Sequence, residues 1–377
     1  MTTAARRNES SASGTLLVAF ELGQSRWVMG LTTSGAARPR TREIAARDTA
    51  QVLAEIERAK RYFRLPAAAP VASCYEAGRD GFWLHRWLLA QGIDNVVVDS
   101  SSIEVPRRAR RAKTDQLDVD GLLRLLGRHR SGERKVWSVV RVPSVESEDA
   151  RQLEREIEAT KADRTRLRNR IQGLLAAQGV RLPLDRHFCA ALQLARTGDG
   201  RPIPPGLCAR LEREAAALAT VEARLVGLAA ARRTQVVPGG VCDRLQHLRG
   251  IGVNGAARLS REWFEWRQFS NGRQVGALAG LTPTPHRSGD LARERGIGKA
   301  GNRRVRSMAI ELAWCWRQFQ PQSALTQWYE QRFGSGPPRL RRIGIVALAR
   351  KLLIALWRYT ETGVVPAGAV LKGAPGR

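Results

Sequence analysis

The sequence predicts an α/β domain built on a mixed sheet, followed by a long helical hairpin and a mainly helical C-terminal region. Three observations predict this class. Short apolar runs of strand length alternate with helical patterns as far as residue 146. Heptad spacing then begins in a stretch rich in Arg, Glu, Leu and Ala, and a Pro-Gly-Gly sequence introduces a third stretch rich in Trp and Arg. We therefore expect a disordered leader at 1–14, domains at 15–146, 147–236 and 237–360, and a flexible tail at 361–377.

The elements of the first domain follow from the positions of its apolar runs. A short Gly-Gln-Ser segment separates the first two runs, which predicts a β-hairpin. The expected strands are 15–20, 27–31, 70–75 and 95–99, and the expected helices are 50–62, 81–91 and one that starts near Asp115. The order β, β, α, β, α, β, α implies a mixed sheet with helices packed against it.

Two heptad patterns predict a pair of long helices in the second region. The first consists of Leu153, Ile157, Thr160, Arg164, Leu167, Ile171 and Leu174, and the second of Leu207, Leu211, Glu214, Leu218, Val221, Leu225 and Leu228. A segment rich in proline and glycine separates the two patterns. The helices are compatible with an antiparallel coiled-coil hairpin or with dimerisation between chains. Because polar residues interrupt the seam, two ordinary bundle helices are an equally open interpretation.

The composition indicates a folded protein with a polyanionic partner. Lys and Arg number 63 against 35 Asp and Glu in 377 residues, which gives a formal net charge of +28. Hydrophobic residues at 43% and charged residues at 26% match globular averages and exclude wholesale disorder. No apolar run approaches the ~20 residues that span a bilayer, so we expect no membrane partner. The five scattered cysteines form no CxxC pair, which argues against disulfides and zinc and favours a cytoplasmic location.

Acidic residues of the first domain stand where sheet topology would bring them together. Glu21 ends the first strand, Glu76 ends the third, and Asp115 and Asp118 share one face at the start of a helix. Sites in open α/β sheets lie at the carboxyl ends of strands. Converging carboxylates need hard divalent cations, and two Mg²⁺ ions about 3.5–4 Å apart can serve phosphodiester chemistry. Each acid alone is unremarkable, and Asp120 is an alternative to Asp118.

A basic run precedes these aspartates. It consists of Arg107, Arg108, Arg110, Arg111 and Lys113. The run places cations where a phosphate backbone would approach a metal site. A solvated basic loop is the alternative interpretation.

The first domain resembles a known family. The segments VAFELG, CYEAG and RRAKTDQLDVDGL are similar to the RuvC-like domain of DEDD-type insertion-sequence transposases, the one-ten family that includes Piv-type invertases. The resemblance implies a ribonuclease-H-like fold and a Mg²⁺-binding tetrad of Glu21, Glu76, Asp115 and Asp118, with Mn²⁺ as another possible metal. Glu21 stands where the commoner pattern has Asp, and Val119 replaces the usual Ala.

The segment LRGIGVNGA opens the third region with a Gly-x-Gly turn between two helical patterns. Gly250 and Gly252 would expose backbone amides that can hold a phosphate. A tight connection between helices also uses glycine, so both interpretations stay open.

Ser288 lies in a loop-like stretch that is crowded with cations. Arginines at a loop of this kind can stabilise a pentavalent phosphorus transition state when a serine attacks, and glycines permit close approach of the backbone to a phosphate. Without further information Ser288 reads as a turn residue. The surrounding cations that we assign to nucleic-acid binding are Arg287, Arg293, Arg295, Lys299, Arg303 and Arg304.

This second block strengthens the resemblance. AGLTPTPHRSG followed by GIGKAGNRRVR is similar to the C-terminal transposase domain of the same family, in which the serine of the SG pair links covalently to DNA. Ser288 is the matching position. The two blocks, in this order and on either side of the heptad region, cover most of residues 15–359.

We therefore expect a DNA transposase or recombinase that uses a serine-DNA intermediate and a Mg²⁺ site. The resemblance also implies a structured non-coding guide RNA and a homo-oligomer, dimer or tetramer. Two alternatives remain from the residues themselves. A RuvC-like nuclease would use the same carboxylates with water as the nucleophile, and a non-catalytic nucleic-acid-binding protein would need neither site.

Overall fold

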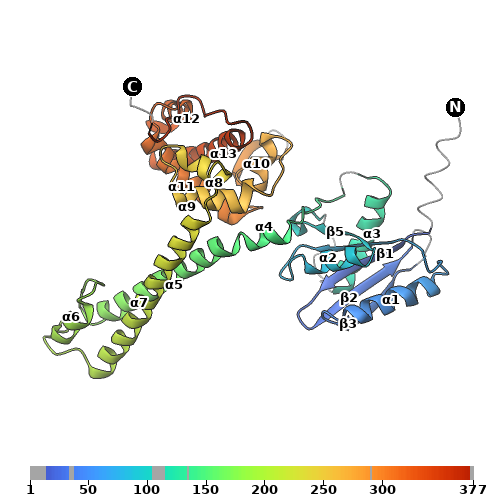
Figure 1. The fold of residues 1–377 in the computed structure, drawn as a ribbon, viewed down its shortest axis with the longest axis horizontal. Helices are drawn as coiled ribbons and strands as arrows, with labels where there is room; N and C mark the ends of the chain where they lie inside the picture. The colour runs from blue at the N-terminus through green and yellow to red at the C-terminus, as the bar shows by residue number, and fades with distance from the viewer. Residues whose placement is uncertain (1–13, 34–37, 104–114, 134–135, 289–290, 374–377) are drawn as a thin grey trace. The chain divides into compact units, whose positions relative to one another are not determined.

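The computed structural model describes residues 14–33, 38–103, 115–133, 136–288 and 291–373 (Figure 1). The chain divides into two compact units, Met1–Val142 and Pro143–Arg377. Across these described ranges no helix is both long and apolar enough to cross a bilayer.

The N-terminal unit is built on a mixed five-stranded sheet in the order β3-β2-β1-β4-β5. Strands β1 and β2 are antiparallel, as are β2 and β3, whereas β1, β4 and β5 run parallel to one another. The expected β-hairpin and the expected mixed sheet are therefore confirmed. The strands are β1 (Leu16–Leu22), β2 (Arg26–Thr32), β3 (Arg40–Ala45), β4 (Val71–Glu76) and β5 (Asp94–Val98).

Strand β3 is an addition to the expected order. Its sequence RTREIA buries only Ile44, so it lacks the apolar run by which the other strands are found. It lies at the edge of the sheet beside β2, where charged side chains face water and discourage pairing with other chains. The expected order, with two strands before the first helix, was wrong at this point.

The sheet carries helices on both faces. On β1, Val18 and Phe20 pack in one apolar cluster with α1 (Thr49–Tyr62) and α2 (Trp83–Ala90). Leu17 and Ala19 pack in a second cluster with α3 (Asp115–Arg130). This alternation is that of a strand buried on both faces. A short 3₁₀ turn, Ser100–Ser102, follows β5.

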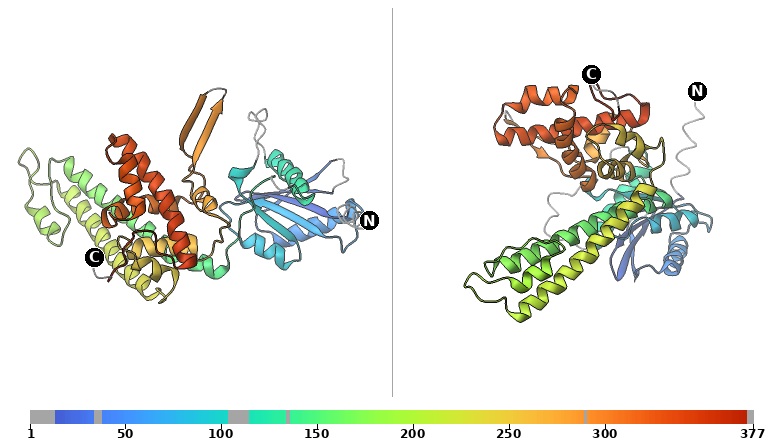
Figure 2. Two further views of the ribbon diagram at one scale, coloured as in Figure 1. Left: turned by 90° about the horizontal axis from the view of Figure 1, so that it is seen from above. Right: turned by 60° about the vertical axis from the view of Figure 1, so that its left-hand side comes forward.

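The C-terminal unit begins with a helical hairpin, which confirms the heptad prediction within one chain. Helices α5 (Gln152–Ala176) and α7 (Pro205–Thr234) lie side by side and antiparallel (Figure 2). The short α4 (Val145–Asp149) precedes them and α6 (Phe188–Leu194) lies between them in sequence.

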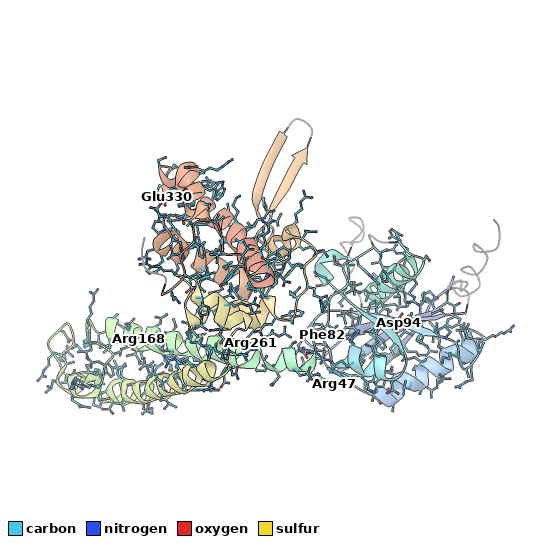
Figure 3. All side chains as sticks on the ribbon, turned by 45° about the horizontal axis from the view of Figure 1, so that its top comes forward. Arg47, Phe82, Asp94, Arg168, Arg261 and Glu330 are labelled. Carbon is cyan, nitrogen blue, oxygen red and sulfur yellow. The ribbon has the colours of Figure 1, made fainter. Side chains whose placement is uncertain are left out.

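No residue at the heptad positions of either helix is exposed, and five of them are buried: Ile157, Thr160, Ile171, Leu211 and Leu218. Ion pairs join the helices across the seam. Arg170 lies 2.9 Å from Glu214, and Arg168, labelled in Figure 3, lies 3.4 Å from Glu222. The polar residues that interrupt the seam thus include one, Glu214, that pairs with the opposite helix.

The rest of this unit is the expected mainly helical region, with one exception. Its core is formed chiefly by α9, α11 and α13, with Trp263, Trp316 and Leu348 fully buried. The helices are α8 (Val241–His247), α9 (Val253–Leu259), α10 (Gly272–Leu278), α11 (Arg303–Phe319), α12 (Ala324–Tyr329) and α13 (Pro338–Thr362), with π-helical turns at Ser260–Phe264 and Glu330–Gly334. The exception is a two-stranded antiparallel ribbon, β6 (Pro283–Ser288) and β7 (Leu291–Ile297), which Figure 2 shows standing out from the helices.

The segment after α13 is not the loose tail that we expected at 361–377. Leu371 forms a bridge with Leu248, Lys372 donates from its backbone amide to His247 and from Nζ to the carbonyl of Ile251, and Val370 accepts from Gln320. These bonds hold the segment as far as residue 373 against the helical core. The sequence did not reveal this because each of these bonds uses at least one backbone group, which leaves little trace in residue types.

A buried ion pair connects the hairpin to the C-terminal helices. Arg155 of α5 donates to Glu262, with Nε 2.9 Å from Oε1. The Glu262 side chain is only 2% exposed. Burial alone would raise the pKa of Glu262, but the hydrogen bond from Arg155 and nearby guanidinium charges outweigh it and lower the pKa. A second pair, Arg304 to Glu158 at 2.6 Å, lies at the surface.

We expect Arg155→Ala to destabilise the C-terminal unit by about 3 kcal/mol, because it leaves the Glu262 carboxylate buried without its partner. This is the lower end of the range for buried pairs, since the Arg155 side chain is 38% exposed. The matched control Arg304→Ala breaks an exposed pair and should cost about 1 kcal/mol or less. Urea unfolding of both variants measures the difference.

The free energy of unfolding that Arg155→Ala loses should become smaller as the pH falls. A carboxyl whose pKa is lowered by folding stabilises the folded state above its unfolded pKa, and this contribution disappears as the pH falls through the folded pKa. The gap between wild type and Arg155→Ala should therefore be largest near neutral pH and close in acid. Equal destabilisation by the two variants near neutral pH would contradict the assignment.

Candidate active site

The carboxyl ends of β1 and β4 border a cavity of about 160 Å³. Glu21 and Glu76 both line it. The strands are parallel, and Phe20 pairs with Tyr75, so each glutamate directly follows one member of a registered pair. The structure thus places the two predicted glutamates in one cavity at the edge of the sheet where ligand sites form.

Helix α3 runs antiparallel to β1. A Cβ at Gly127, near the C-terminal end of α3, would lie 3.7 Å from Leu17, which is near the start of β1. Closer to its N-terminus, Val119 lies over Gly30, which pairs with Ala19. Moving toward the start of α3 therefore moves toward the carboxyl end of β1.

Asp115 and Asp118 occupy the first turn of this helix, on the side of the cavity-lining strand ends. They stand four residues before Val119 and Leu122, which are both buried against the sheet, so they continue the sheet-facing stripe of α3. Asp120 lies off this stripe. Its Oδ1 is buried and has no hydrogen-bond partner among the described residues, and burial raises its pKa.

Val119 and Gly30 explain one departure from the family pattern. A Cβ at Gly30 would collide with Cγ1 of Val119. The glycine on β2 therefore makes the room that the larger side chain at 119 requires. The first turn of α3 can lie against the sheet in spite of the replacement of the usual alanine.

The electrostatics at this edge reflect the negative charge of Glu76. Cys74 lies two residues before Glu76, on the same face of β4, and its Sγ is 3.9 Å from the carbonyl oxygen of Leu122. Burial, followed by the charge of Glu76, raises the pKa of Cys74. This thiol is therefore held in its neutral form and is not a candidate nucleophile.

The four predicted acids do not form a closed ligand set in the structure. Among the side chains described, no three from His, Cys, Asp and Glu are grouped closely enough to hold a metal ion. The glutamate pair shares a cavity, and the two aspartates start their helix on the same side of the sheet. Two carboxylates provide part of the oxygen ligand set that Mg²⁺ takes in proteins.

Asp80 also lines the cavity, and sequence reasoning missed it. Its side chain is 6% exposed and accepts from Arg47, labelled in Figure 3, at 3.1 Å and from Arg79 at 3.3 Å. The two guanidinium groups offset the negative charge of this carboxylate. Asp80 thereby holds two cations beside the cavity. Its position four residues after Glu76, in a turn that contains glycine, was the available signal.

We expected Ser288 to lie in a loop, but the structure places it as the last residue of β6. It pairs with Leu291 across the ribbon, and His286, two residues earlier, pairs with Arg293. Only two residues, Gly289 and Asp290, separate the strands, and they lie outside the described residues. A Gly-Asp pair between two runs of strand length is a hairpin pattern, and the many glycines of this stretch hid it.

The base of the ribbon is fastened to α10 and α11. The Arg306 guanidinium donates to the carbonyls of Lys299 at 2.8 Å and Ala279 at 3.2 Å. Gly280 and Gly301 both have positive φ, and a Cβ on either would collide with a backbone carbonyl. The ribbon that ends in Ser288 thus starts from a tightly packed backbone junction.

The predicted cations near Ser288 have different surroundings. Arg287, Arg293 and Arg295 lie on the two strands of the ribbon. Lys299 and Arg303 are exposed, whereas Arg304 pairs with Glu158 and thereby fastens α11 to the hairpin. The basic run Arg107, Arg108, Arg110, Arg111 and Lys113 lies outside the described residues.

The Gly-x-Gly turn joins α8 to α9. Gly250 has a φ of +87°, and a Cβ there would lie 3.0 Å from Cβ of Phe319 on α11. Gln320 donates to the carbonyl of Arg249 at 2.8 Å. Gly250 therefore has a packing role, while Gly252 precedes α9 with open space around it.

Comparison with known proteins adds a family to this geometry. A family model described as "Transposase IS116/IS110/IS902 family" matches residues 242–329, which include the ribbon, its base and Ser288. A Sinorhizobium fredii (strain NBRC 101917 / NGR234) protein named "Putative transposase y4rJ" is 41% identical over 377 residues, covering 95% of each chain.

Two further relatives are more distant. A Pseudomonas aeruginosa protein named "Probable family 20 transposase" is 29% identical over 235 residues, covering 60% of this chain and 68% of its own. The Yersinia enterocolitica transposase for insertion sequence element IS1328 is 24% identical over 215 residues, covering 56% and 63%. With 41% identity along nearly its whole length to one such transposase, the chain belongs to the IS116/IS110/IS902 family of insertion-sequence transposases.

Proposed function

We propose that this transposase cuts and rejoins DNA strands through a covalent link between Ser288 and DNA, assisted by Mg²⁺ at the carboxylates of the N-terminal unit. The observation that carries the proposal is the position of Ser288. It ends a strand of a ribbon whose base is fastened by Arg306, inside the segment that matches the family. The ribbon itself stands out from the helices of the C-terminal unit (Figure 2).

The serine step conserves phosphoester bonds. The Ser288 hydroxyl gives up its proton to a base or to solvent, and its oxygen forms a bond to phosphorus. The bond from phosphorus to one sugar oxygen breaks, and that oxygen takes up a proton and leaves as a hydroxyl. A later attack by a DNA hydroxyl on the phosphoserine reverses the exchange with a new strand, so no external energy source is needed.

The strand order β3-β2-β1-β4-β5 supports a ribonuclease-H-like, RuvC-like assignment for the N-terminal unit. In this proposal Glu21 and Glu76 would hold Mg²⁺ or Mn²⁺ from the strand ends, and Asp115 and Asp118 would add ligands from the first turn of α3. The metal would supply charge stabilisation at the phosphodiester. The arginines that compensate Asp80 keep positive charge at the rim, where a phosphate backbone would enter.

We further propose a structured guide RNA and a homo-oligomer, both by analogy with the family. The net charge of +28 is compatible with binding both RNA and DNA, and charge alone does not distinguish between them. The hairpin of α5 and α7 uses its seam within the chain, so contacts between copies would involve its outer faces.

We expect Mg²⁺ to raise the thermal unfolding midpoint of the N-terminal unit, since a ligand that binds only the folded state stabilises it by about 2.7 kcal/mol at a hundredfold excess over Kd. Asp118→Asn should remove most of this effect. Asp120→Asn, a neighbouring carboxylate off the sheet-facing stripe, is the matched control and should leave it intact. Calorimetry over a Mg²⁺ series measures both, and the opposite ranking would transfer the ligand role to Asp120.

We expect wild-type protein to form a covalent protein-DNA band on a denaturing gel when it is given labelled DNA with the element's junction, Mg²⁺ and RNA from the flanking non-coding region. Ser288→Ala and Asp115→Ala should each reduce that band by at least about 10³-fold, because one removes the nucleophile and the other a metal ligand. Ser270→Ala, an exposed serine in the same family segment, should leave it unchanged.

The same gel separates the second candidate function. A cavity lined by two glutamates at the strand ends also suits a RuvC-like nuclease that uses water. Cleavage without a covalent band, retained by Ser288→Ala and lost in Asp115→Ala, would favour this nuclease and overturn the role of Ser288. Unchanged activity in both variants would overturn both candidates.

A further inference from the structure

A hollow of about 470 Å³ lies between α10 and α13, and its lining includes none of the residues assigned above to the acidic cavity or to the ribbon. Asn271, Gly272 and Arg273 line it from the start of α10. On the opposite side Arg350, Ile354 and Arg358 line it from α13. Figure 1 shows the two helices as neighbours in the C-terminal unit.

Two glycines set the close approach of the helices. A Cβ at Gly272 would lie 3.0 Å from Cγ2 of Ile354, and a Cβ at Gly276 would lie 3.0 Å from Nε of Arg350. The stem of Arg350 therefore passes over Gly276. Asn271 accepts hydrogen bonds from the amide of Arg273 at 3.0 Å, which fixes the start of α10. The hollow is thus bounded by side chains of α13 that pack against the glycines of α10.

The charges around the hollow are uncompensated. Arg350, Ile354 and Arg358 follow each other at intervals of four and form one stripe along α13. The guanidinium groups of Arg273, Arg350 and Arg358 make no ion pair or side-chain hydrogen bond with any residue that the structure describes, and no carboxylate lines the hollow.

Some other arginines of the same unit do have an acidic partner. Arg155, Arg304 and Arg317 are each within 3 Å of a glutamate oxygen. Holding three arginines together without acids costs electrostatic free energy, and a polyanion offsets that cost when it binds.

We propose that this hollow binds the phosphodiester backbone of duplex DNA. Arg350 and Arg358 stand eight residues apart, about 12 Å along the helix at about 1.5 Å per residue. Phosphates of one DNA strand recur about every 3.4 Å of the duplex axis, so a strand that runs along α13 presents different phosphates to these two arginines. Arg273 contacts the strand from the other wall, and Ile354 gives the deoxyribose an apolar surface between the cations.

The proposal depends on DNA as the substrate of the family, but not on the serine chemistry of the proposed function. Binding can therefore be measured on protein that carries Ser288→Ala and without Mg²⁺, where no strand is cut. Failure of the covalent-link proposal leaves this measurement unaffected, and failure here leaves that proposal standing.

The experiment is fluorescence anisotropy of labelled duplex DNA with the full-length protein over a salt series. The test variant is Arg273→Gln with Arg358→Gln, both exposed in the structure. The matched control is Arg210→Gln with Arg213→Gln, two exposed arginines of α7 with the same change in net charge. Thermal unfolding checks that both variants keep the fold, and Arg350→Lys tests the fork geometry while it retains the charge.

The logarithm of the association constant K falls as the logarithm of the salt concentration rises. We expect the test variant to make this slope less steep by about 1.8, which is two contacts at about 0.9 each. Binding at about 0.1 M salt should weaken by at least about tenfold. The control should change the slope by less than half as much. Equal losses in both variants would show a general effect of net charge and overturn the proposal. A loss confined to a structured RNA of the same length, with DNA binding intact, would also overturn it.

Discussion

The carboxylate of Glu262 is buried at a point where two parts of the C-terminal unit meet, and Arg155 is the group that makes its burial tolerable. The partners are 107 residues apart in sequence, so their pairing requires the hairpin and the helical core to be formed together. One turn further along α5, Glu158 pairs with Arg304 of α11. Arg306, two residues after Arg304 on the same helix, binds the carbonyl of Lys299 at the base of the ribbon. The contacts that hold the base of the Ser288 ribbon in place therefore begin at the buried carboxylate of Glu262.

The two candidate chemical groups belong to separate units, each with its own apolar core. In the N-terminal unit, the parallel strands determine where the glutamates stand, and the direction of α3 determines where the aspartates stand. In the C-terminal unit, glycines at the ribbon base permit close contacts between backbones, and glycines of α10 let side chains of α13 pack against that helix. Each set of groups is therefore positioned by packing within its own unit.

Elements with many buried side chains could be predicted from the sequence. Segments that are held mainly by backbone hydrogen bonds could not. The strands and heptad helices have periodic apolar positions, so their types and approximate bounds followed from the sequence. Strand β3, the ribbon and the segment after α13 are held mainly by backbone hydrogen bonds, which leave little trace in residue types. For the same reason Glu21 and Glu76 could be placed at one edge, whereas Asp80 and the arginines around α10 depend on tertiary contacts.

The antiparallel pairing of α5 and α7 constrains how this chain can change length in evolution. Removing one residue from α7 would rotate everything beyond it by about 100° and separate Glu214 and Glu222 from Arg170 and Arg168. Seven residues restore the seam because they complete two turns. Insertions and deletions in this hairpin should therefore occur in matched heptads on both helices, and homologous hairpins should differ in length by whole repeats.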